Sequence, residues 1–329
     1  MIFSGGTAKA VVKTLESSSS FDRHHLGHIL FQITKMMNLN KQASAVDAKP
    51  SLNARIARAL RCLRLLPGWG RLVNMAVPSQ SAKFTIRNGE TMFCGDIRSF
   101  IDRQIYLFGG YEAEFIETFL SMIPAHRRGT ILDIGANVGN HSLAFGQIFD
   151  VVHSFEPNPQ LWSQFERNIE LNALRNIHLH MVGLADHDEE LVLHMIDKPN
   201  MGLGTFSTIE QYDLPLKAIA TCPVRHAGRY LSKLDINNVD ALKIDVQGFE
   251  PEVLIGLNEV LRQCRPIVWC EIGTGTRIKI GTLDELAQLI PFDFTCFKFE
   301  ARSALHPWRP KLTACNGALD SGDYLVVPK

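Results

Sequence analysis

The sequence predicts an α/β protein built on a mainly parallel, doubly wound sheet. From residue 130 onward, short apolar strands alternate with amphipathic helices, which is the pattern of a parallel sheet covered by helices on both faces. A glycine-rich turn at residues 135–139 follows the first of these strands, and an acid, Glu156, follows the second. Because such strand ends meet at one edge of the sheet, the sequence also predicts a ligand site there.

Size and composition indicate one large domain with an accessory segment. The chain has 329 residues, of which 46% are hydrophobic and 21% are charged, as in ordinary globular proteins. Lysine plus arginine and aspartate plus glutamate each number 34. The basic excess typical of a nucleic-acid binder is therefore missing, and we expect no nucleic-acid partner.

The seven cysteines are widely spaced and include no C-x-x-C pair, so we expect reduced thiols and no metal site. No apolar run is long enough to cross a bilayer. The first residues also lack the charged-then-apolar layout of a signal peptide. Together these observations predict a cytoplasmic protein.

Residues 1–76 differ from the rest and predict an N-terminal helical extension, with a polar linker over residues 38–50. Within it, residues 55–66 carry an arginine at every third position beside an apolar face. This basic stripe fits a solvated helix face packed on the main domain, or a helix that contacts a membrane surface or a partner. The remainder, residues 77–329, is the predicted main domain.

The elements of the main domain follow in order. An Asn-Gly pair between two alternating runs predicts a hairpin over residues 83–93. Apolar side chains at helical spacing predict a helix over residues 111–123. The first three core strands are expected at residues 130–134, 151–155 and 177–182, with Asn158 and Pro159 starting the helix between the second and third.

The second half of the main domain continues this alternation. Residues 190–230 are less regular and predict short antiparallel pieces. Buried strands are expected at residues 241–246 and 266–271, with a helix starting at Pro251 between them. Thr282 and Glu285 form a capping box for a further helix. Two closing strands are expected at residues 292–299 and 324–327.

The glycine turn and the acid after the second strand point to a nucleotide-like ligand. Glycines at 135 and 139 allow a sharp turn and a close approach of backbone to ligand. Asn137 stands where the dinucleotide fingerprint G-x-G-x-x-G has its second glycine, which disfavours a pyrophosphate against the backbone. Glu156 is placed to accept hydrogen bonds from ribose hydroxyls.

Three motifs in this order resemble the FkbM family of S-adenosylmethionine-dependent methyltransferases. They are D-I-G-A-N-V-G at residues 133–139, F-E-P-N at 155–158 and K-I-D-V-Q-G-F-E at 243–250. Further matches are G-Y-E at 110–112 and Y-L-V-V-P at 324–328, so the resemblance covers roughly residues 83–328. It implies a class I, Rossmann-like methyltransferase with a seven-stranded sheet. It also implies O-methylation of a hydroxyl on a sugar, glycan or polyketide-like small molecule.

The resemblance also implies roles for the cofactor-binding residues. The turn with Gly135, Ala136, Asn137 and Gly139 would hold the methionine part of S-adenosylmethionine. Asp133 would lie near its amino group, and Glu156 would hold its ribose. Adenine recognition would come from the end of the third strand, at Asp186.

Catalytic candidates lie at the ends of the next two strands. Asp245 is the candidate base or acceptor-orienting residue, because a hydroxyl must lose its proton as it attacks the methyl group. Lys243 points to the same strand face. It would pair with Asp245 or Glu250 or lower the pKa of an acceptor group, unless its ion pair is purely structural. Glu271 would stand at the edge of the same site, whereas Gln247, where many family members have glutamate, is given no chemistry.

Two other functions stay open from the sequence alone. One is an NAD(P)-dependent oxidoreductase on a Rossmann-like sheet, and the other is a non-catalytic module that binds S-adenosylmethionine. His141, in the first turn of the helix after the glycine turn, is expected to pack rather than to react. Neither the methyl acceptor nor the oligomeric state follows from the sequence, and a homo-oligomer stays open.

Overall fold

The structure is a computed structural model that describes residues 83–88, 90–196, 204–205, 216–277, 279–300 and 311–329. The predicted N-terminal extension over residues 1–76, including the arginine stripe at 55–66, lies outside these ranges. The chain divides into two compact units, Met1–Tyr111 and Glu112–Lys329, and each is described by itself. None of the helices within the described ranges has both the length and the apolar character needed to cross a membrane.

The described part of the first unit contains the predicted hairpin and one helix. Strands β1 (Lys83–Asn88) and β2 (Thr91–Asp96) pair antiparallel, with Asn88 opposite Thr91. Helix α5 (Phe100–Phe108) follows and ends at Gly109 in the left-handed region. Asp102 of α5 is buried and accepts a hydrogen bond from the backbone N–H of Asp96 at 2.8 Å. The predicted hairpin is confirmed.

The second unit contains a large mixed sheet of eight strands in the order β13-β12-β14-β11-β10-β3-β4-β5. The strands β3, β4, β5, β10 and β11 run parallel, and β12, β13 and β14 complete the sheet through antiparallel pairs. Their bounds are β3 (Thr130–Ile134), β4 (Val151–Phe155), β5 (Ile177–His180), β10 (Ala241–Ile244), β11 (Ile267–Ile272), β12 (Phe294–Glu300), β13 (Lys311–Ala314) and β14 (Gly322–Pro328).

The strand count corrects the sequence-based prediction, which was seven. The additional strand is β13, which pairs antiparallel with β12. It has four residues, K-L-T-A, and is exposed or half-buried throughout. An edge strand that buries no apolar face gives no alternating pattern, so the sequence carried no signal for it.

A second sheet of four strands accounts for the irregular region at residues 190–230. Its order is β6-β9-β7-β8, with β7 and β9 forming a long antiparallel pair. The third predicted strand ends earlier than expected, at His180, because the following residues form β6 and pair with β9 instead. The bounds are β6 (Gly183–Ala185), β7 (Glu189–Ile196), β8 (Gly204–Thr205) and β9 (Leu216–His226).

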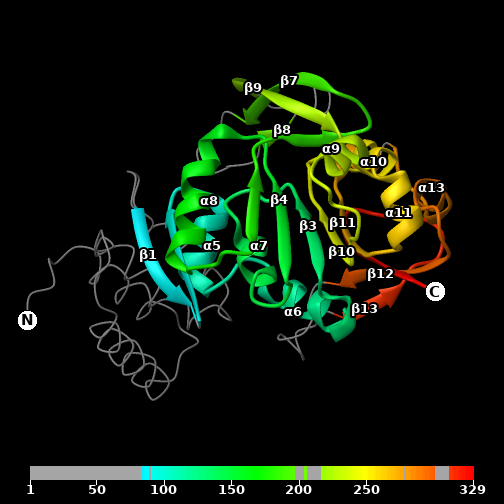
Figure 1. Ribbon diagram of the computed structural model, residues 1–329, viewed down its shortest axis with the longest axis horizontal. Helices are drawn as coiled ribbons and strands as arrows, with labels where there is room; N and C mark the ends of the chain where they lie inside the picture. Colours follow the sequence, from blue (N-terminus) through cyan, green and yellow to red (C-terminus); the bar gives the residue numbers. More distant parts are fainter. Residues whose placement is uncertain (1–82, 89, 197–203, 206–215, 278, 301–310) are drawn as a thin grey trace, which may run out of the picture. The chain divides into compact units, whose positions relative to one another are not determined.

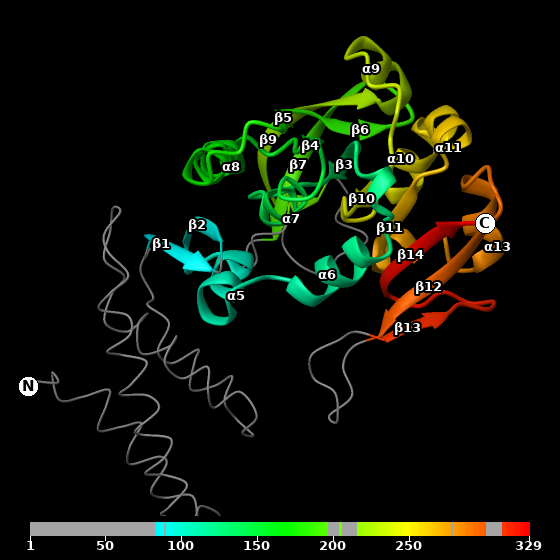
Figure 2. The same ribbon diagram turned by 60° about the horizontal axis from the view of Figure 1, so that its bottom comes forward.

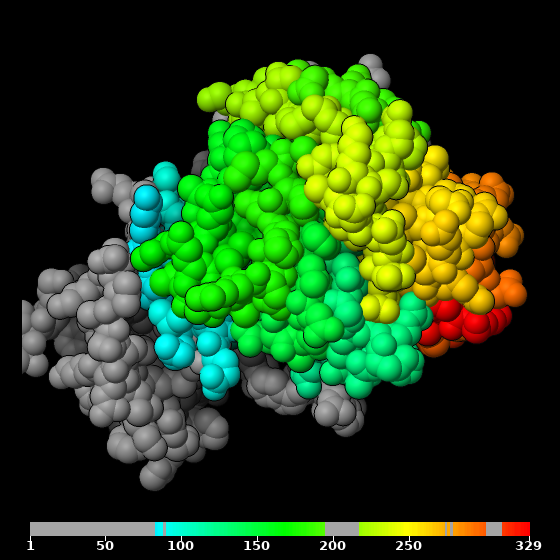
Figure 3. Space-filling view, viewed as in Figure 1, coloured from blue at the N-terminus to red at the C-terminus, as the bar shows by residue number. Residues whose placement is uncertain are grey.

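Helices cover both faces of the large sheet, as Figures 1 and 2 show. One face carries α9 (Ala227–Lys233), α10 (Glu250–Gly256), α11 (Asn258–Cys264) and α13 (Leu283–Leu289). The opposite face carries α6 (Ala113–Ser121), α7 (Asn140–Phe145) and α8 (Pro159–Leu171). The short helices η2 (Ala125–Arg127) and α12 (Thr274–Arg277) complete the unit. Figure 3 gives a space-filling view from the same side as Figure 1.

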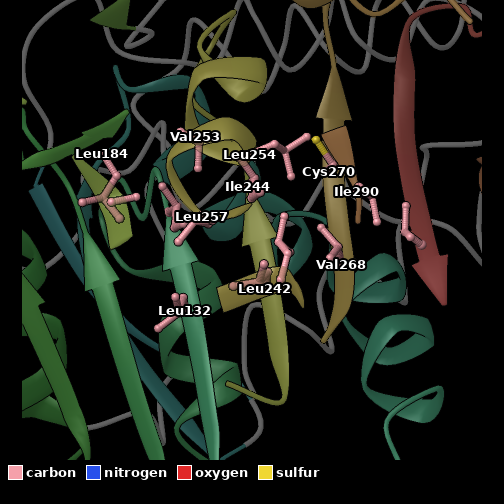
Figure 4. Close-up of a cluster of buried hydrophobic side chains, with 14 of the residues drawn as sticks. Leu132, Leu184, Leu242, Ile244, Val253, Leu254, Leu257, Val268, Cys270 and Ile290 are labelled. Atoms are coloured by element: carbon pink, nitrogen blue, oxygen red, sulfur yellow. The ribbon is translucent and has the colours of Figure 1, made fainter. Parts of the chain in front are cut away.

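The main core lies between the sheet and the helices α9, α10, α11 and α13. Figure 4 shows side chains of β3, β10 and β11 pointing toward the leucines of α10 and the turn after it. Leu132, Leu242 and Leu257 of this core are completely buried. Alternate residues of the same strands therefore point to the opposite face, where the candidate site lies.

Candidate active site

The candidate site begins where the strand order reverses. From β3 the chain proceeds outward through β4 and β5, and it later returns to β10 on the other side of β3. The loops after β3 and β10 consequently lie next to each other at the carboxyl edge of the sheet. The backbone N–H of Asp245 donates to the carbonyl of Ile134 at 3.0 Å, which ties the two loops together. Ligands of doubly wound sheets bind at such a switch point.

Gly135 makes this close approach of the two loops feasible. Its φ is +82°, and a Cβ at this position would lie 1.8 Å from the carbonyl oxygen of Asp245. Any side chain would therefore collide with backbone, which cannot rotate away as a flexible side chain can. The glycine is required both by its backbone angle and by its neighbour.

The rest of the glycine turn is supported from α8. Gly139 has a φ of +85°, and a Cβ there would meet the ring of Phe165 at 2.3 Å. Asn168 is completely buried and donates from its side-chain amide to the carbonyl of Val138 at 3.0 Å. Asn168 therefore supports the turn from α8.

Glu156, after β4, closes the other side of the turn. Its carboxylate accepts from the backbone N–H of Asn137 and from the backbone N–H of Asn158, both at 2.8 Å. Asn137 itself has a φ of +52° and lies in the left-handed region. Burial raises the pKa of Glu156 to about 7, although both backbone N–H groups favour its ionised form.

Asp133, the acid of β3, is completely buried beneath the turn. One of its oxygens, Oδ2, accepts from the hydroxyl of Ser142, which in turn accepts from Ser154 at 2.8 Å. The other oxygen, Oδ1, has no hydrogen-bond partner among the described residues. A buried carboxylate oxygen without a donor is costly, so a donor from a bound molecule would satisfy it.

Lys243 is the buried cation of the site. Its ammonium donates to the carbonyl of Gly135 at 3.1 Å and to Asp245 Oδ2 at 3.4 Å, and it lies 3.7 Å from Asp133 Oδ1. Burial disfavours the charge, but the carboxylates of Asp245 and Asp133 outweigh it and raise the pKa of Lys243. The predicted contact with Asp245 is present, and the ammonium also holds the glycine turn.

Asp245 and Glu271 form a carboxyl pair at the ends of β10 and β11. The side-chain amide of Gln247 donates to both carboxyls, at 2.7 Å to Asp245 Oδ1 and at 2.9 Å to Glu271 Oε2. Burial opposes ionisation of Asp245, but the charge of Lys243 outweighs it and lowers the pKa of Asp245 to about 2. The negative charge of Asp245, together with burial, raises the pKa of Glu271 to about 10. Asp245 is therefore the ionised member of the pair and Glu271 the protonated one.

The fold and these side chains fit what the comparisons with known proteins show. Residues 133–296 match the sequence profile described as the methyltransferase FkbM domain. This segment belongs to the FkbM methyltransferase family. The match begins at Asp133 and includes the glycine turn, Glu156, Lys243 and Glu271.

Individual relatives of this methyltransferase are distant. Methyltransferase 1 of Beauveria bassiana (strain ARSEF 2860) is 26% identical over 163 residues, which is 44% of this chain and 65% of that protein. The FkbM methyltransferase of Methylobacillus flagellatus KT shares 11% identity with a TM-score of 0.38, covering 91% of this chain and 60% of the other. The precorrin-6y C5,15-methyltransferase of Geobacter metallireducens GS-15 shares 14% identity with a TM-score of 0.34, covering 66% and 88%.

A methyltransferase of this family takes its methyl group from S-adenosylmethionine, and the residues at the switch point fit that molecule. Oδ1 of Asp133 accepts no hydrogen bond among the described residues, although the Lys243 ammonium lies 3.7 Å away, so it can accept one from an ammonium group of the cofactor. Asp133, Asp245 and Lys243 together carry one net negative charge, and the cofactor, with a sulfonium, an ammonium and a carboxylate, carries one net positive charge. The negatively charged pyrophosphate of a dinucleotide cofactor would be repelled by the carboxylates of the site. The assignment replaces the oxidoreductase hypothesis.

Sequence reasoning did not identify the contacts that four further residues make around the candidate site. Glu112, the residue before α6, has a φ of +54° and binds His141 of α7 through Oε2 and Nε2 at 3.1 Å. His141 is buried and meets the ring of Trp269 edge-on, as its expected packing role requires. The indole of Trp269 donates to Asp323 at 2.8 Å, and burial raises the pKa of Asp323 to about 7.

Asp186 lies apart from this group. It follows β6, in the second sheet, and its carboxylate binds His187 at 2.6 Å, while His187 also binds Glu189 at 2.9 Å. The structure therefore places Asp186 in a surface network with its immediate neighbours. Among the described residues, no group of histidine, cysteine, aspartate and glutamate side chains has the arrangement of a metal site.

Proposed function

We propose that this methyltransferase transfers the methyl group of S-adenosylmethionine to a hydroxyl oxygen of a sugar, glycan or polyketide-like molecule. The observation that carries the proposal is the contrast between Asp245 and the charged groups behind it. The side chain of Asp245 is 28% exposed, whereas those of Lys243 and Asp133 are 3% and 0% exposed. An ionised carboxylate that reaches the surface of the site is a hydrogen-bond acceptor for a hydroxyl.

Methyl transfer to a hydroxyl is an in-line displacement at carbon. The acceptor oxygen forms its bond to the methyl carbon as the carbon–sulfur bond breaks, and the electron pair of that bond stays on sulfur. The enzyme therefore contributes mainly by alignment. Asp245 orients the hydroxyl and accepts its proton. Because the pKa of Asp245 is about 2, the proton passes on to water and the carboxylate is restored.

The cofactor would be held by the residues of the switch point. The turn with Gly135, Ala136, Asn137 and Gly139 would surround the methionine part. Asp133 would accept from the amino group, and Glu156 would accept from the ribose hydroxyls with the lone pairs that its two backbone donors leave unused. Lys243 would act as the counter-ion that keeps Asp245 ionised, rather than as a group that reaches the acceptor.

Asp186 keeps its proposed role toward adenine only if its carboxylate leaves His187.

The cytoplasm remains our proposed compartment, supported by the cysteines within the described ranges, all of which are free thiols.

The test is transfer of a labelled methyl group from S-adenosylmethionine to a panel of sugars, glycans and hydroxylated metabolites, with the product identified by NMR. We expect a methyl ether. Asp245→Asn should lower the transfer rate by at least tenfold and leave the affinity for S-adenosylhomocysteine nearly intact, while Asp150→Asn, at an exposed position away from the site, should change neither. Cofactor binding without transfer to any member of the panel would favour a non-catalytic binding module.

A further inference from the structure

One side chain connects the two carboxyls at the acceptor side of the site. The side-chain amide nitrogen of Gln247 donates to Asp245 Oδ1 at 2.7 Å and to Glu271 Oε2 at 2.9 Å. A primary amide has two N–H donors, and these two bonds use both of them. Gln247 thereby joins the loop after β10 to the end of β11.

The backbone around Gln247 holds the amide in this position. Gln247 has a φ of +55°, and the following Gly248 has a φ of +106°. Glu250, at the start of α10, accepts from the backbone N–H groups of Val246 at 2.9 Å and Gly248 at 3.0 Å. The hydroxyl of Thr276 binds the same carboxylate. A non-glycine residue kept in the left-handed region by its surroundings is typical of functional sites.

The electrostatic surroundings explain why a neutral donor is needed between the two carboxyls. The positive charge of Lys243 favours the ionised form of Asp245, and His141 contributes in the same direction. Glu271 faces the carboxyls of Asp323 and Glu250 in addition to Asp245. A further negative charge at position 247 would lie within hydrogen-bond distance of both carboxyls of the pair and would therefore be unfavourable. An amide donates to both carboxyls without adding charge.

We propose that Gln247 is a positioning residue whose amide holds the carboxyls of Asp245 and Glu271 together, so that an ionised carboxylate and a protonated carboxyl stand side by side toward the methyl acceptor. This inference rests on the proposed function in that the acceptor is a hydroxyl compound. Asp245 accepts from the hydroxyl that is methylated, and Glu271 donates to a neighbouring oxygen. The arrangement suits a vicinal diol, as found in sugars, better than an isolated alcohol.

The test follows the protonation of Glu271 directly and needs no acceptor. The full-length protein, with ¹³C-labelled glutamate and glutamine side chains, is titrated by NMR, and the Glu271 signal is assigned through its loss in Glu271→Gln. We expect the native signal to stay in its protonated form well above the ordinary glutamate range. In Gln247→Met, which loses both donors, the midpoint should rise by about one pH unit, a tenfold increase in proton affinity.

A second variant tests the charge argument. Gln247→Glu brings a third carboxyl to the pair, so we expect two protonated carboxyls where the native protein has one, at pH 8. Gln263→Glu is the matched control, because Gln263 also donates to a glutamate, Glu259, but on an exposed helix. It should leave the Glu271 signal unchanged. A native Glu271 that ionises in the ordinary glutamate range, or Gln247 variants that titrate like the native protein, would overturn the proposal.

Failure of this inference is distinguishable from failure of the proposed function. If the native protein binds S-adenosylhomocysteine but methylates only nitrogen or carbon acceptors, the hydroxyl-directed function is wrong and the proposed role of the carboxyl pair is overturned with it. If hydroxyl methylation is found while the variants titrate like the native protein, only the role of Gln247 is overturned.

Discussion

Replacing Gly135 by alanine tests the contact between the two loops of the switch point. The new Cβ would lie 1.8 Å from the carbonyl oxygen of Asp245, whereas ordinary contact begins at 3.4 Å, so the loops must separate by up to 1.6 Å, the difference between these values. Alanine at a φ of +82° costs about 1–2 kcal/mol. The separation also weakens the bond from Lys243 to the carbonyl of Gly135, worth about 1.5–3 kcal/mol.

These contributions predict that Gly135→Ala lowers the free energy of unfolding by about 2.5–5 kcal/mol. Gly317 provides a matched control, because its φ is +83° but a Cβ there would meet nothing within 4 Å. Gly317→Ala should therefore lose only the backbone contribution, about 1–2 kcal/mol.

Urea unfolding of both variants measures the difference, and calorimetry with S-adenosylhomocysteine measures its effect on the site. We expect the affinity to fall by at least tenfold in Gly135→Ala, since displacements near 1 Å disrupt a preorganised site, and to stay native in Gly317→Ala. Equal stabilities of the two variants, together with native affinity in Gly135→Ala, would show that the close contact of the two loops does not shape the site.

Three further predictions concern individual side chains. First, Asn168→Leu should lower the free energy of unfolding by about 1–3 kcal/mol and weaken cofactor binding, because the buried amide holds the carbonyl of Val138; native values in urea unfolding and calorimetry would contradict this. Second, since burial raises the pKa of Glu156 to about 7, the affinity for S-adenosylhomocysteine should fall as the pH drops below 7, and Glu156→Gln should bind weakly at every pH; a pH-independent native affinity would count against the ribose role. Third, burial and neighbouring histidines lower the pKa of His153 and His180, which are hydrogen-bonded at 3.0 Å, to about 4. The stability they contribute is complete above pH 6.5 and is lost as the pH falls toward 4. In His180→Gln, the free energy of unfolding should therefore fall less steeply with pH over this range. An unchanged slope would argue against this role of the two histidines.

The sequence predicted the central strands and the glycine turn because their signals are local. Short, mostly apolar runs marked β3, β4, β10 and β11, and the turn after β3 carried two glycines with positive φ. Lys243 and Asp245, two positions apart along one strand, were expected on the same face, and their side chains form an ion pair. The same reasoning could not supply β13, which has no buried face.

The outer part of the site was not predictable because its contacts join distant elements. Glu112 and His141 are 29 positions apart, and Trp269 and Asp323 are 54 positions apart. Their pairing depends on how α6, α7, β11 and β14 are placed against one another, and no local pattern of the sequence encodes that register. The bridging role of Gln247 could not be predicted because Glu271, one of its two acceptors, lies 24 positions away in the sequence.

A structure of the protein with S-adenosylhomocysteine bound is the measurement that tests the proposed cofactor site most directly. We expect the ribose hydroxyls within hydrogen-bond distance of the Glu156 carboxylate, the amino group on Oδ1 of Asp133, and the sulfur on the side of Asp245. A ligand bound elsewhere, or a ribose held by other residues with Glu156 unchanged, would contradict the proposed site.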